Sequence, residues 1–247
     1  ESISVKKVYV IGRSHGYMLK SAAIMNPEEF KYSFSFPFIG PNEFPDMLDK
    51  TDGESKLPAI ISNFLFNQLD SNSYIVISIL NNEHNQIGLF YKGEPFVVTD
   101  IYNRVPYTDG EELISSKLIA SHFNDKQRDL LTFIKLVKKT IPAQRVIIMG
   151  GVPPVGDVNY IKKFLLERDF SDLNIIKREV HKVLFEWQEK IINEICQSEG
   201  VTYFGVPDGV LDNEGFLAEK YWQNASHANH HYGRLVLQNI CNFINAN

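Results

Sequence analysis

The architecture of this protein is clearest in residues 8–16, which read Val8-Tyr9-Val10-Ile11-Gly12-Arg13-Ser14-His15-Gly16. Four apolar, β-prone residues run into a turn bounded by glycines, and a helical pattern follows from Tyr17. A short apolar run, a turn and a helix are typical of a strand in a parallel sheet with its crossover helix. The serine between the two glycines is therefore expected at the carboxyl edge of the sheet, where α/β proteins bind ligands.

The same alternation of strand and helix patterns continues along the chain. Near-continuous apolar runs predict strands that helices cover on both faces. We therefore predict an α/β fold, a three-layer α/β/α sandwich around a parallel sheet of about five strands. The predicted strands are residues 5–11, 32–39, 74–80, 145–149 and 201–206, and the predicted helices are residues 57–69, 111–140, 158–167, 175–198 and 232–244.

Residues 86–99 interrupt this alternation. Two short apolar segments, residues 88–91 and 95–98, flank Lys92-Gly93-Glu94, and a glycine-containing loop of this length is typical of a β-hairpin. We predict a small β-hairpin insertion, either as a surface decoration or as a flap over the site. No repeat or long linker divides the chain, so one domain over residues 1–247 is expected.

The composition excludes several classes of protein. With 44% hydrophobic and 22% charged residues the chain is of the globular kind, and its net charge of −5 argues against a nucleic-acid partner. The most apolar stretch, residues 74–80, is too short to span a bilayer, which takes about 20 residues. Cys196 and Cys241 are expected to be buried thiols. Residues 1–10 lack the regions of a signal peptide, which slightly favours a cytoplasmic location.

Three polar clusters carry the residues that could do chemistry. Ser14 could be a nucleophile near helix N-terminal amides, or it could simply cap the helix. Residues 81–85 follow the third strand at the same sheet edge, so an asparagine there could donate to an oxyanion or close a turn. His227, before the last helix, could act as a general base if the fold brings it beside Ser14.

Together the clusters resemble the SGNH hydrolases, also called the GDSL-like esterase and lipase superfamily. The family's first block, glycine-aspartate-serine, is similar to Gly12-Arg13-Ser14, and its third, glycine-any-asparagine-aspartate, to Leu80-Asn81-Asn82-Glu83. The last block, aspartate-any-any-histidine, is similar to Asn224-Ala225-Ser226-His227. The glycine of the second block corresponds best to Gly40.

The resemblance implies a fold and a mechanism. The sheet would have the flavodoxin-like strand order, Ser14 would be the nucleophile, and His227 would be the base. The oxyanion hole would combine the amides of Ser14 and Gly40 with the side chain of Asn82. No cofactor is implied, and the substrate would be a small-molecule or carbohydrate ester.

The sequence departs from the family pattern at Arg13, Leu80 and Asn224, which replace an aspartate, a glycine and a second aspartate. Asn224 can accept a hydrogen bond from an imidazole, but it carries no charge to stabilise the imidazolium. The site is therefore either an active Ser14–His227 dyad or a degenerate scaffold that binds a glycan or a protein. Possible replacement carboxylates, among which the sequence does not choose, are Asp208, Asp212, Glu214 and Glu219.

The substrate class rests on the resemblance. The family includes lipases, thioesterases, carbohydrate esterases and sugar O-acetyltransferases, and the lack of a long exposed apolar segment favours a small acyl group, such as acetyl, on a carbohydrate. Water or an acceptor hydroxyl would resolve the acyl-enzyme, so hydrolase and transferase both stay open, as does the oligomeric state. His227, His230 and His231 offer the alternative of a metal site, although a fourth ligand is lacking.

Overall fold

A computed structural model describes residues 6–30, 33–90, 93–99, 101, 105, 108, 110–170 and 175–247. Its centre is a five-stranded sheet in which every neighbouring pair of strands is parallel. The order across the sheet is β2-β1-β3-β6-β7, which confirms the flavodoxin-like order. The strands are β1 (Lys7–Gly12), β2 (Ser33–Ile39), β3 (Ser73–Ser78), β6 (Val146–Met149) and β7 (Thr202–Phe204).

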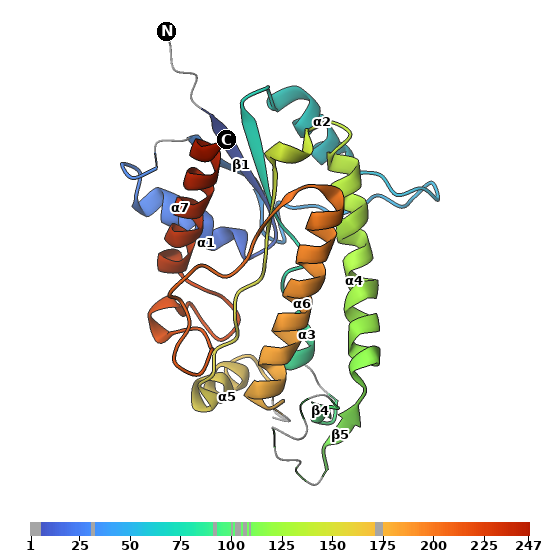
Figure 1. The fold of residues 1–247 in the computed structure, drawn as a ribbon, viewed down its shortest axis with the longest axis vertical. Coiled ribbons are helices and arrows are strands. Elements are labelled where there is room, and N and C mark those ends of the chain that lie inside the picture. The colour runs from blue at the N-terminus through green and yellow to red at the C-terminus, as the bar shows by residue number, and fades with distance from the viewer. Residues whose placement is uncertain are drawn as a thin grey trace.

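Helices cover both faces of the sheet (Figure 1). Side chains alternate between the faces, so Val8 and Val10 pack toward one layer while Ile75 and Ile77 pack toward the other. This two-sided burial is the reason for the continuous apolar runs, and the predicted three-layer sandwich is confirmed. One layer consists of α1 (Gly16–Met25) and α7 (His230–Ala246), and the other of α2 (Ala59–Gln68), α4 (Ser116–Val137) and α6 (Arg178–Glu199).

Local chemistry fixes where several helices begin and end. The Ser115 side chain accepts hydrogen bonds from two amides at the start of α4, and the Asn229 side chain accepts one, from the amide of His231, at the start of α7. Gly200 ends α6 in the left-handed conformation that glycine favours. The amides of Gln223 and Asn224 both bond to the carbonyl of His227, and this turn shapes the segment that enters the candidate site.

Shorter elements lie beyond the carboxyl ends of the strands (Figure 1). They are α3 (Glu83–Gly88), α5 (Val158–Leu166), β4 (Phe96–Val98), β5 (Glu112–Ile114) and the 3-10 turn η2 (Glu219–Tyr221), whereas the 3-10 turn η1 (Ala143–Arg145) directly precedes β6 at the amino edge of the sheet. The predicted β-hairpin is wrong, because β4 pairs with β5, and the pairing is parallel. Parallel strands require a longer connection than a hairpin turn provides.

The first strand of the predicted hairpin is instead the end of a helix. The amides of Leu89 and Phe90 both bond to the carbonyl of Asn85, and Leu89 is buried against α5. The apolar residues therefore serve helix packing, which a short apolar run does not distinguish from a strand. Tyr91 and Lys92, which belonged to that prediction, lie outside the described residues.

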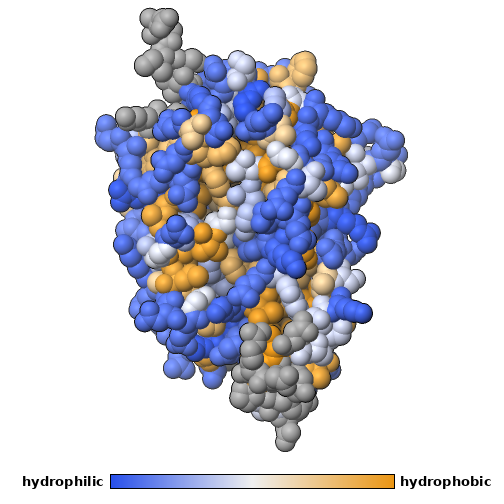
Figure 2. Space-filling model, viewed as in Figure 1, coloured by the Kyte–Doolittle hydropathy of each residue, from blue (hydrophilic) through white to orange (hydrophobic). Residues whose placement is uncertain are grey.

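The surface is mixed in character. The face seen in Figure 2 is mostly hydrophilic, with apolar residues gathered in separate patches. Among the described residues, no helix combines the length and apolarity that a membrane crossing needs. Both cysteines are free thiols; Cys196 is buried as predicted, whereas Cys241 is only partly buried. That the whole chain forms one domain stays a prediction.

Candidate active site

Ser14 and His227 meet at the carboxyl edge of the sheet. Ser14 lies in the turn between β1 and α1, His227 lies just before α7, and Nε2 of His227 is 2.9 Å from Oγ of Ser14. Packing of α1 against α7 brings the two segments together. The alternative that Ser14 caps α1 is wrong, since His15 occupies the cap position and no side chain caps this helix.

The other ring nitrogen of His227 faces two neutral side chains. Nδ1 lies 2.8 Å from Oγ of Ser226 and 3.2 Å from Oδ1 of Asn224. Asn224 Oδ1 also accepts hydrogen bonds from the amide and the hydroxyl of Ser226, at 2.9 and 3.1 Å. With a proton on Nδ1, the imidazole is held in the tautomer whose Nε2 can accept a proton from Ser14.

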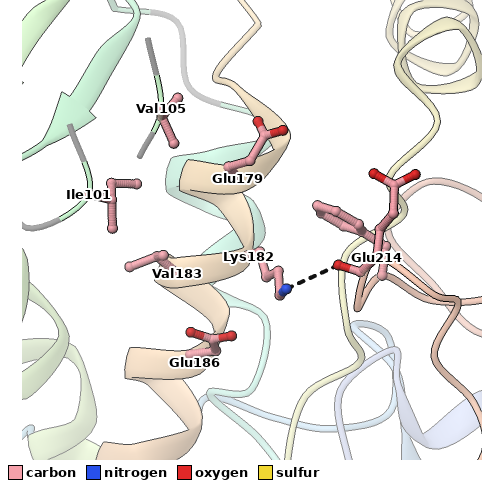
Figure 3. A pocket seen from close by; sticks show the side chains of 8 residues that line it. Ile101, Val105, Glu179, Lys182, Val183, Glu186 and Glu214 are labelled. Atoms are coloured by element: carbon pink, nitrogen blue, oxygen red, sulfur yellow. Dashed lines mark hydrogen bonds between the residues drawn. The ribbon is translucent and has the colours of Figure 1, made fainter. Parts of the chain in front are cut away.

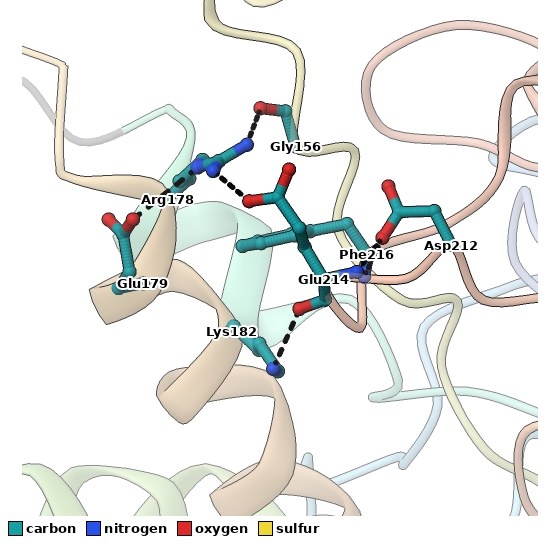
Figure 4. A network of polar contacts seen from close by, with 7 residues as sticks. All are labelled: Gly156, Arg178, Glu179, Lys182, Asp212, Glu214 and Phe216. Carbon is teal, nitrogen blue, oxygen red and sulfur yellow. Dashed lines mark hydrogen bonds and ion pairs between the residues drawn. The ribbon is translucent and has the colours of Figure 1, made fainter.

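None of the four candidate carboxylates hydrogen-bonds to His227 in the described part of the chain. Asp212 accepts the amides of Glu214 and Phe216, and Glu214 pairs with Arg178 on α6 (Figure 4). Lys182 donates to the carbonyl of Glu214 at 3.1 Å, so this network ties residues 212–216 to α6. Neither Asp212 nor Glu214 takes the place of the family's aspartate.

The surroundings of His227 favour its neutral form. Burial lowers the pKa of His227 below its ordinary value, and the positive charge of Arg168 lowers this pKa further. A general base must be neutral to accept a proton. The site therefore keeps His227 ready to accept a proton over a wider pH range than an exposed histidine would have.

Asn82 follows β3, and the oxygen of its side-chain amide is held by two hydrogen bonds. Oδ1 of Asn82 accepts from Nε2 of His15 at 3.0 Å and from Nδ2 of Asn85 at 2.7 Å. No hydrogen bond within the described residues uses Nδ2 of Asn82, so its two hydrogens are free to donate. Asn82 is the N-cap residue of α3, but its side chain does not cap that helix.

A chain of buried polar side chains continues behind Asn82. Oδ1 of Asn85 lies 2.8 Å from Nε2 of His181 on α6, and the His181 ring stacks on His84. His15, His84 and His181 are almost fully buried, and this burial is the main cause that lowers the pKa of each to about 3. All three are therefore neutral at ordinary pH, and His15 and His181 act as fixed hydrogen-bond donors to the two asparagines.

Gly40 does not have a free amide. Its N–H donates to the carbonyl of Gly12 at 2.9 Å, so the expectation that this amide serves the oxyanion hole is not met in this structure. The glycine is required for another reason, because its φ is +88° and a Cβ atom would lie 1.9 Å from the Tyr17 hydroxyl. Gly40 thus makes room for Tyr17.

The structure shows the surroundings of Leu80 and Arg13, two of the residues that depart from the family pattern. Leu80 has φ of +53°, the region that favours glycine, which is the residue the family has at this place. Arg13 is exposed, and its guanidinium lies 5.5 Å from the centre of the Phe44 ring. Leu80 therefore holds a backbone conformation in which a glycine would be less strained.

Two surface hollows meet at Ser14. The first, which we call the α1 hollow, runs along α1 beside His227 and is lined by Tyr17, Met18, Ser21, Met25, Pro41, Gln223, Ala228, Asn229 and His230. The second, which we call the Asn82 hollow, is lined by Arg13, Met47, Ile79, Leu80, Asn81, Asn82, Glu83 and Gln86. Ser14 and His15 line both.

Another hollow lies beside α6, between Glu179, Lys182 and Glu186 on one side and Glu214 on the other (Figure 3). Of the residues proposed for the site from the sequence, only the candidate carboxylate Glu214 lines it, and Ser14, Asn82 and His227 do not. Within the described ranges, no group of three histidine, cysteine, aspartate or glutamate side chains could hold a metal ion. His230 and His231 lie with ring centres 4.1 Å apart, while both ring nitrogens of His227 face side chains of the site.

Sequence reasoning missed several residues of the site. Ser226 lay inside the quoted C-terminal block and His15 inside the quoted stretch 8–16, and neither was given a role. Asn85 belonged to the polar cluster at residues 81–85, but nothing indicated its contact with His181, which spans 96 positions of sequence. A buried histidine on a helix can be assigned to a site only when its neighbours in space are known.

Comparison with known proteins identifies the fold. No family model matches the chain, and no curated protein matches it in sequence. A lipopolysaccharide acetyltransferase periplasmic domain from Salmonella ser. Paratyphi A superimposes with a TM-score of 0.53 at 16% identity, covering 98% of this chain and 84% of that one. An extracellular lipase from Streptomyces rimosus gives 0.52 at 12%, covering 96% and 100%. The chain has the fold of the SGNH, or GDSL-like, hydrolases.

Proposed function

We propose that this protein is a serine esterase or acyltransferase that acts on a small acyl ester, with Ser14 as nucleophile and His227 as base. The observation that carries the proposal is the 2.9 Å contact between Ser14 Oγ and His227 Nε2, which lies within the reach that proton transfer requires. Two segments 213 positions apart supply these groups, at the sheet edge where this architecture binds ligands.

The proposed reaction has two halves. Ser14 Oγ attacks the ester carbonyl carbon while His227 Nε2 takes its proton, and the tetrahedral intermediate then expels the alcohol oxygen, which receives that proton. Water, or an acceptor hydroxyl, next gives a proton to His227 and attacks the acyl carbon. The bond between that carbon and Ser14 Oγ then breaks, Oγ takes the proton from His227, and the acid or the new ester is released. These steps use only groups of the chain and the substrates.

Two donors are assigned to the oxyanion. The Asn82 amide is one, because its Oδ1 is held by His15 and Asn85 while Nδ2 is left to donate. The amide of Ser14 is the other, since no described hydrogen bond uses it. Gly40 is omitted because its amide is already bonded to Gly12. Removing one side-chain donor of this kind costs about 10²–10³ in kcat.

Ser226 and Asn224 take the part of the orienting carboxylate in this proposal. The imidazole N–H donates to Ser226, whose hydroxyl donates in turn to Asn224. Because both groups are neutral, they fix the ring without stabilising its charge, and we expect a slower enzyme than one with a full triad.

The substrate proposed is an O-acetyl group, or another short acyl group, on a carbohydrate. One structure with the same fold is named as a lipopolysaccharide acetyltransferase domain, which supports acyl transfer on a sugar as the class of reaction. The polar residues beside Ser14 in both hollows, among them Ser21, Gln86 and Gln223, also suit a hydroxylated substrate.

The test is turnover of p-nitrophenyl acetate by the wild-type protein and by Ser14→Ala and His227→Gln. The proposal expects both variants to lose at least about 10³ of the rate. Equal rates in all three proteins would contradict it. That result would favour the second candidate, a glycan- or protein-binding module, for which the replacement of the family's aspartate by Asn224 is the specific observation.

A further inference from the structure

The two hollows that meet at Ser14 differ in which catalytic group they contain. His227 lines the α1 hollow and is absent from the lining of the Asn82 hollow. Asn82 lines only the Asn82 hollow. The substrate must therefore be placed so that one of its parts faces His227 and another faces Asn82.

The proposed reaction decides which part faces which residue. In the tetrahedral intermediate the carbonyl carbon carries the Ser14 oxygen, the oxyanion, the acyl carbon and the oxygen of the leaving alcohol. The leaving oxygen must lie beside His227 Nε2, because that nitrogen holds the proton that the oxygen receives. The oxyanion must lie beside Asn82. The alcohol then extends along the α1 hollow, and the acyl group enters the Asn82 hollow.

We infer that the α1 hollow is the alcohol and acceptor subsite, and that it takes a hydroxylated ring such as a pyranose stacked on Tyr17. This inference rests on the proposed function. Tyr17 is 45% exposed although it is aromatic, and its hydroxyl end is packed against Gly40, which fixes the position of the ring. An exposed aromatic face beside polar side chains suits a sugar, whose rings have apolar faces and hydroxyl edges.

Polar groups lie where the ring's hydroxyls would be. Ser21 is one helical turn beyond Tyr17 on α1 and is exposed, as is Gln223, and both line the hollow. His230, which is half-buried, also lines the hollow, and no described hydrogen bond uses its ring nitrogens. Each of these side chains can donate to or accept from a hydroxyl.

The Asn82 hollow is built differently. Met47 and Leu80 give it apolar wall next to the oxyanion donor, and Arg13, Glu83 and Gln86 line it with polar groups. A short acyl group would meet Met47 and Leu80, whereas a long chain would reach charged side chains, whose desolvation is unfavourable. The geometry thus assigns the short acyl group to this side.

The assignment is tested with two series of substrates. In one series the acyl group is always acetyl and the alcohol is p-nitrophenol or methyl glucoside; in the other the alcohol is always p-nitrophenol and the acyl group lengthens from acetyl to hexanoyl. Tyr17→Ala should raise KM for the acetylated glucoside about tenfold while Tyr17→Phe keeps it, and neither should alter the acyl-length preference. Met47→Ala should shift that preference toward longer acyl groups and leave KM for the glucoside unchanged.

Phe66, which is 80% exposed and lines neither hollow, gives a matched control for the loss of an exposed ring, and Phe66→Ala should change nothing. An unchanged KM for the glucoside in Tyr17→Ala would overturn the inference, and so would a changed acyl-length preference in that variant. Failure of the proposed function is distinct, because the wild-type protein would then show no Ser14-dependent turnover of any substrate.

Discussion

Oγ of Ser226 lies 2.8 Å from Nδ1 of His227, nearer than the amide oxygen of Asn224 at 3.2 Å. The nitrogen remote from Ser14 is therefore held by neutral groups, where the SGNH pattern has a carboxylate. Neutral acceptors keep the ring in the tautomer that a general base needs, but they do not favour the imidazolium that forms on proton transfer. A negative charge added beside Nδ1 of His227 should therefore raise the rate of ester turnover.

Asn224→Asp should increase kcat/KM for p-nitrophenyl acetate by about tenfold or more, because the carboxylate would stabilise the imidazolium of His227. In a serine protease the converse change costs about 10⁴-fold in kcat. Steady-state rates measure the effect, and the same change made together with Ser14→Ala should give no increase. If the single variant is no faster, the ring is oriented well enough without charge.

Ser226→Ala should lower kcat by about tenfold with little change in KM, since it removes the nearest acceptor of the His227 N–H. Ser226→Thr keeps the hydroxyl and should restore most of the rate. Loss of rate in both variants alike would show that the packing of residue 226, which is only 5% exposed, matters more than its hydrogen bond.

The pH profile should report the neutral state of His227. Because burial and Arg168 lower its pKa, kcat/KM should stay constant as the pH falls through 6.5 and decline only at lower pH. Arg168→Gln removes the positive charge and should move the acid limb of the profile to higher pH. The shift should shrink at high salt, since Arg168 is exposed. An acid limb that does not move in this variant would contradict the assignment.

His181 is distant in sequence from Asn85 and Asn82, but it should influence catalysis through the hydrogen bonds that link it to them. His181→Phe removes the partner of Asn85 and loosens Asn82, so kcat should fall about tenfold while KM stays the same. In the Asn82→Ala background the same change should have no further effect on kcat. An equal loss in both backgrounds would mean that His181 serves only the stability of the fold.

Acid should destabilise the protein well above pH 3. His15, His84 and His181 have folded-state pKa values of about 3, so between pH 6.5 and 3 the unfolded chain binds protons that the folded chain does not. Each should lower the free energy of unfolding by about 1.4 kcal/mol per pH unit in that window. Burial raises the pKa of Glu189 to about 7, which opposes part of this loss between pH 7 and 4.5.

Urea unfolding at pH 7, 6 and 5 measures this dependence. His84→Gln should reduce the slope of the free energy of unfolding against pH by about 1.4 kcal/mol per pH unit, the contribution of one histidine, because a glutamine cannot be protonated. A variant with the wild-type slope would show that His84 is not held neutral in the folded protein.

Much of the fold followed from local patterns. Strands buried on both faces, such as β3 with all six residues buried, must be continuously apolar, so their positions and the sandwich were predictable. The short segment at residues 88–91 was not, because an apolar run of that length fits a helix end as well as a strand. The start of α4 was also placed too early, since residues 112–114 form β5 before Ser115 caps the helix.

The sequence by itself determined the alternation of strands and helices and made Ser14 and His227 candidates, because spacing and residue type are properties of the chain. The choice of Asn82 among the asparagines after the third strand came from the resemblance to the SGNH pattern. Only the tertiary structure decided that Ser226 faces His227, that His181 supports Asn82 through Asn85, and that the Gly40 amide is occupied by Gly12. The physical reason is that hydrogen bonds depend on distances of a few tenths of an ångström, and for groups distant in sequence these distances are set by how the layers pack.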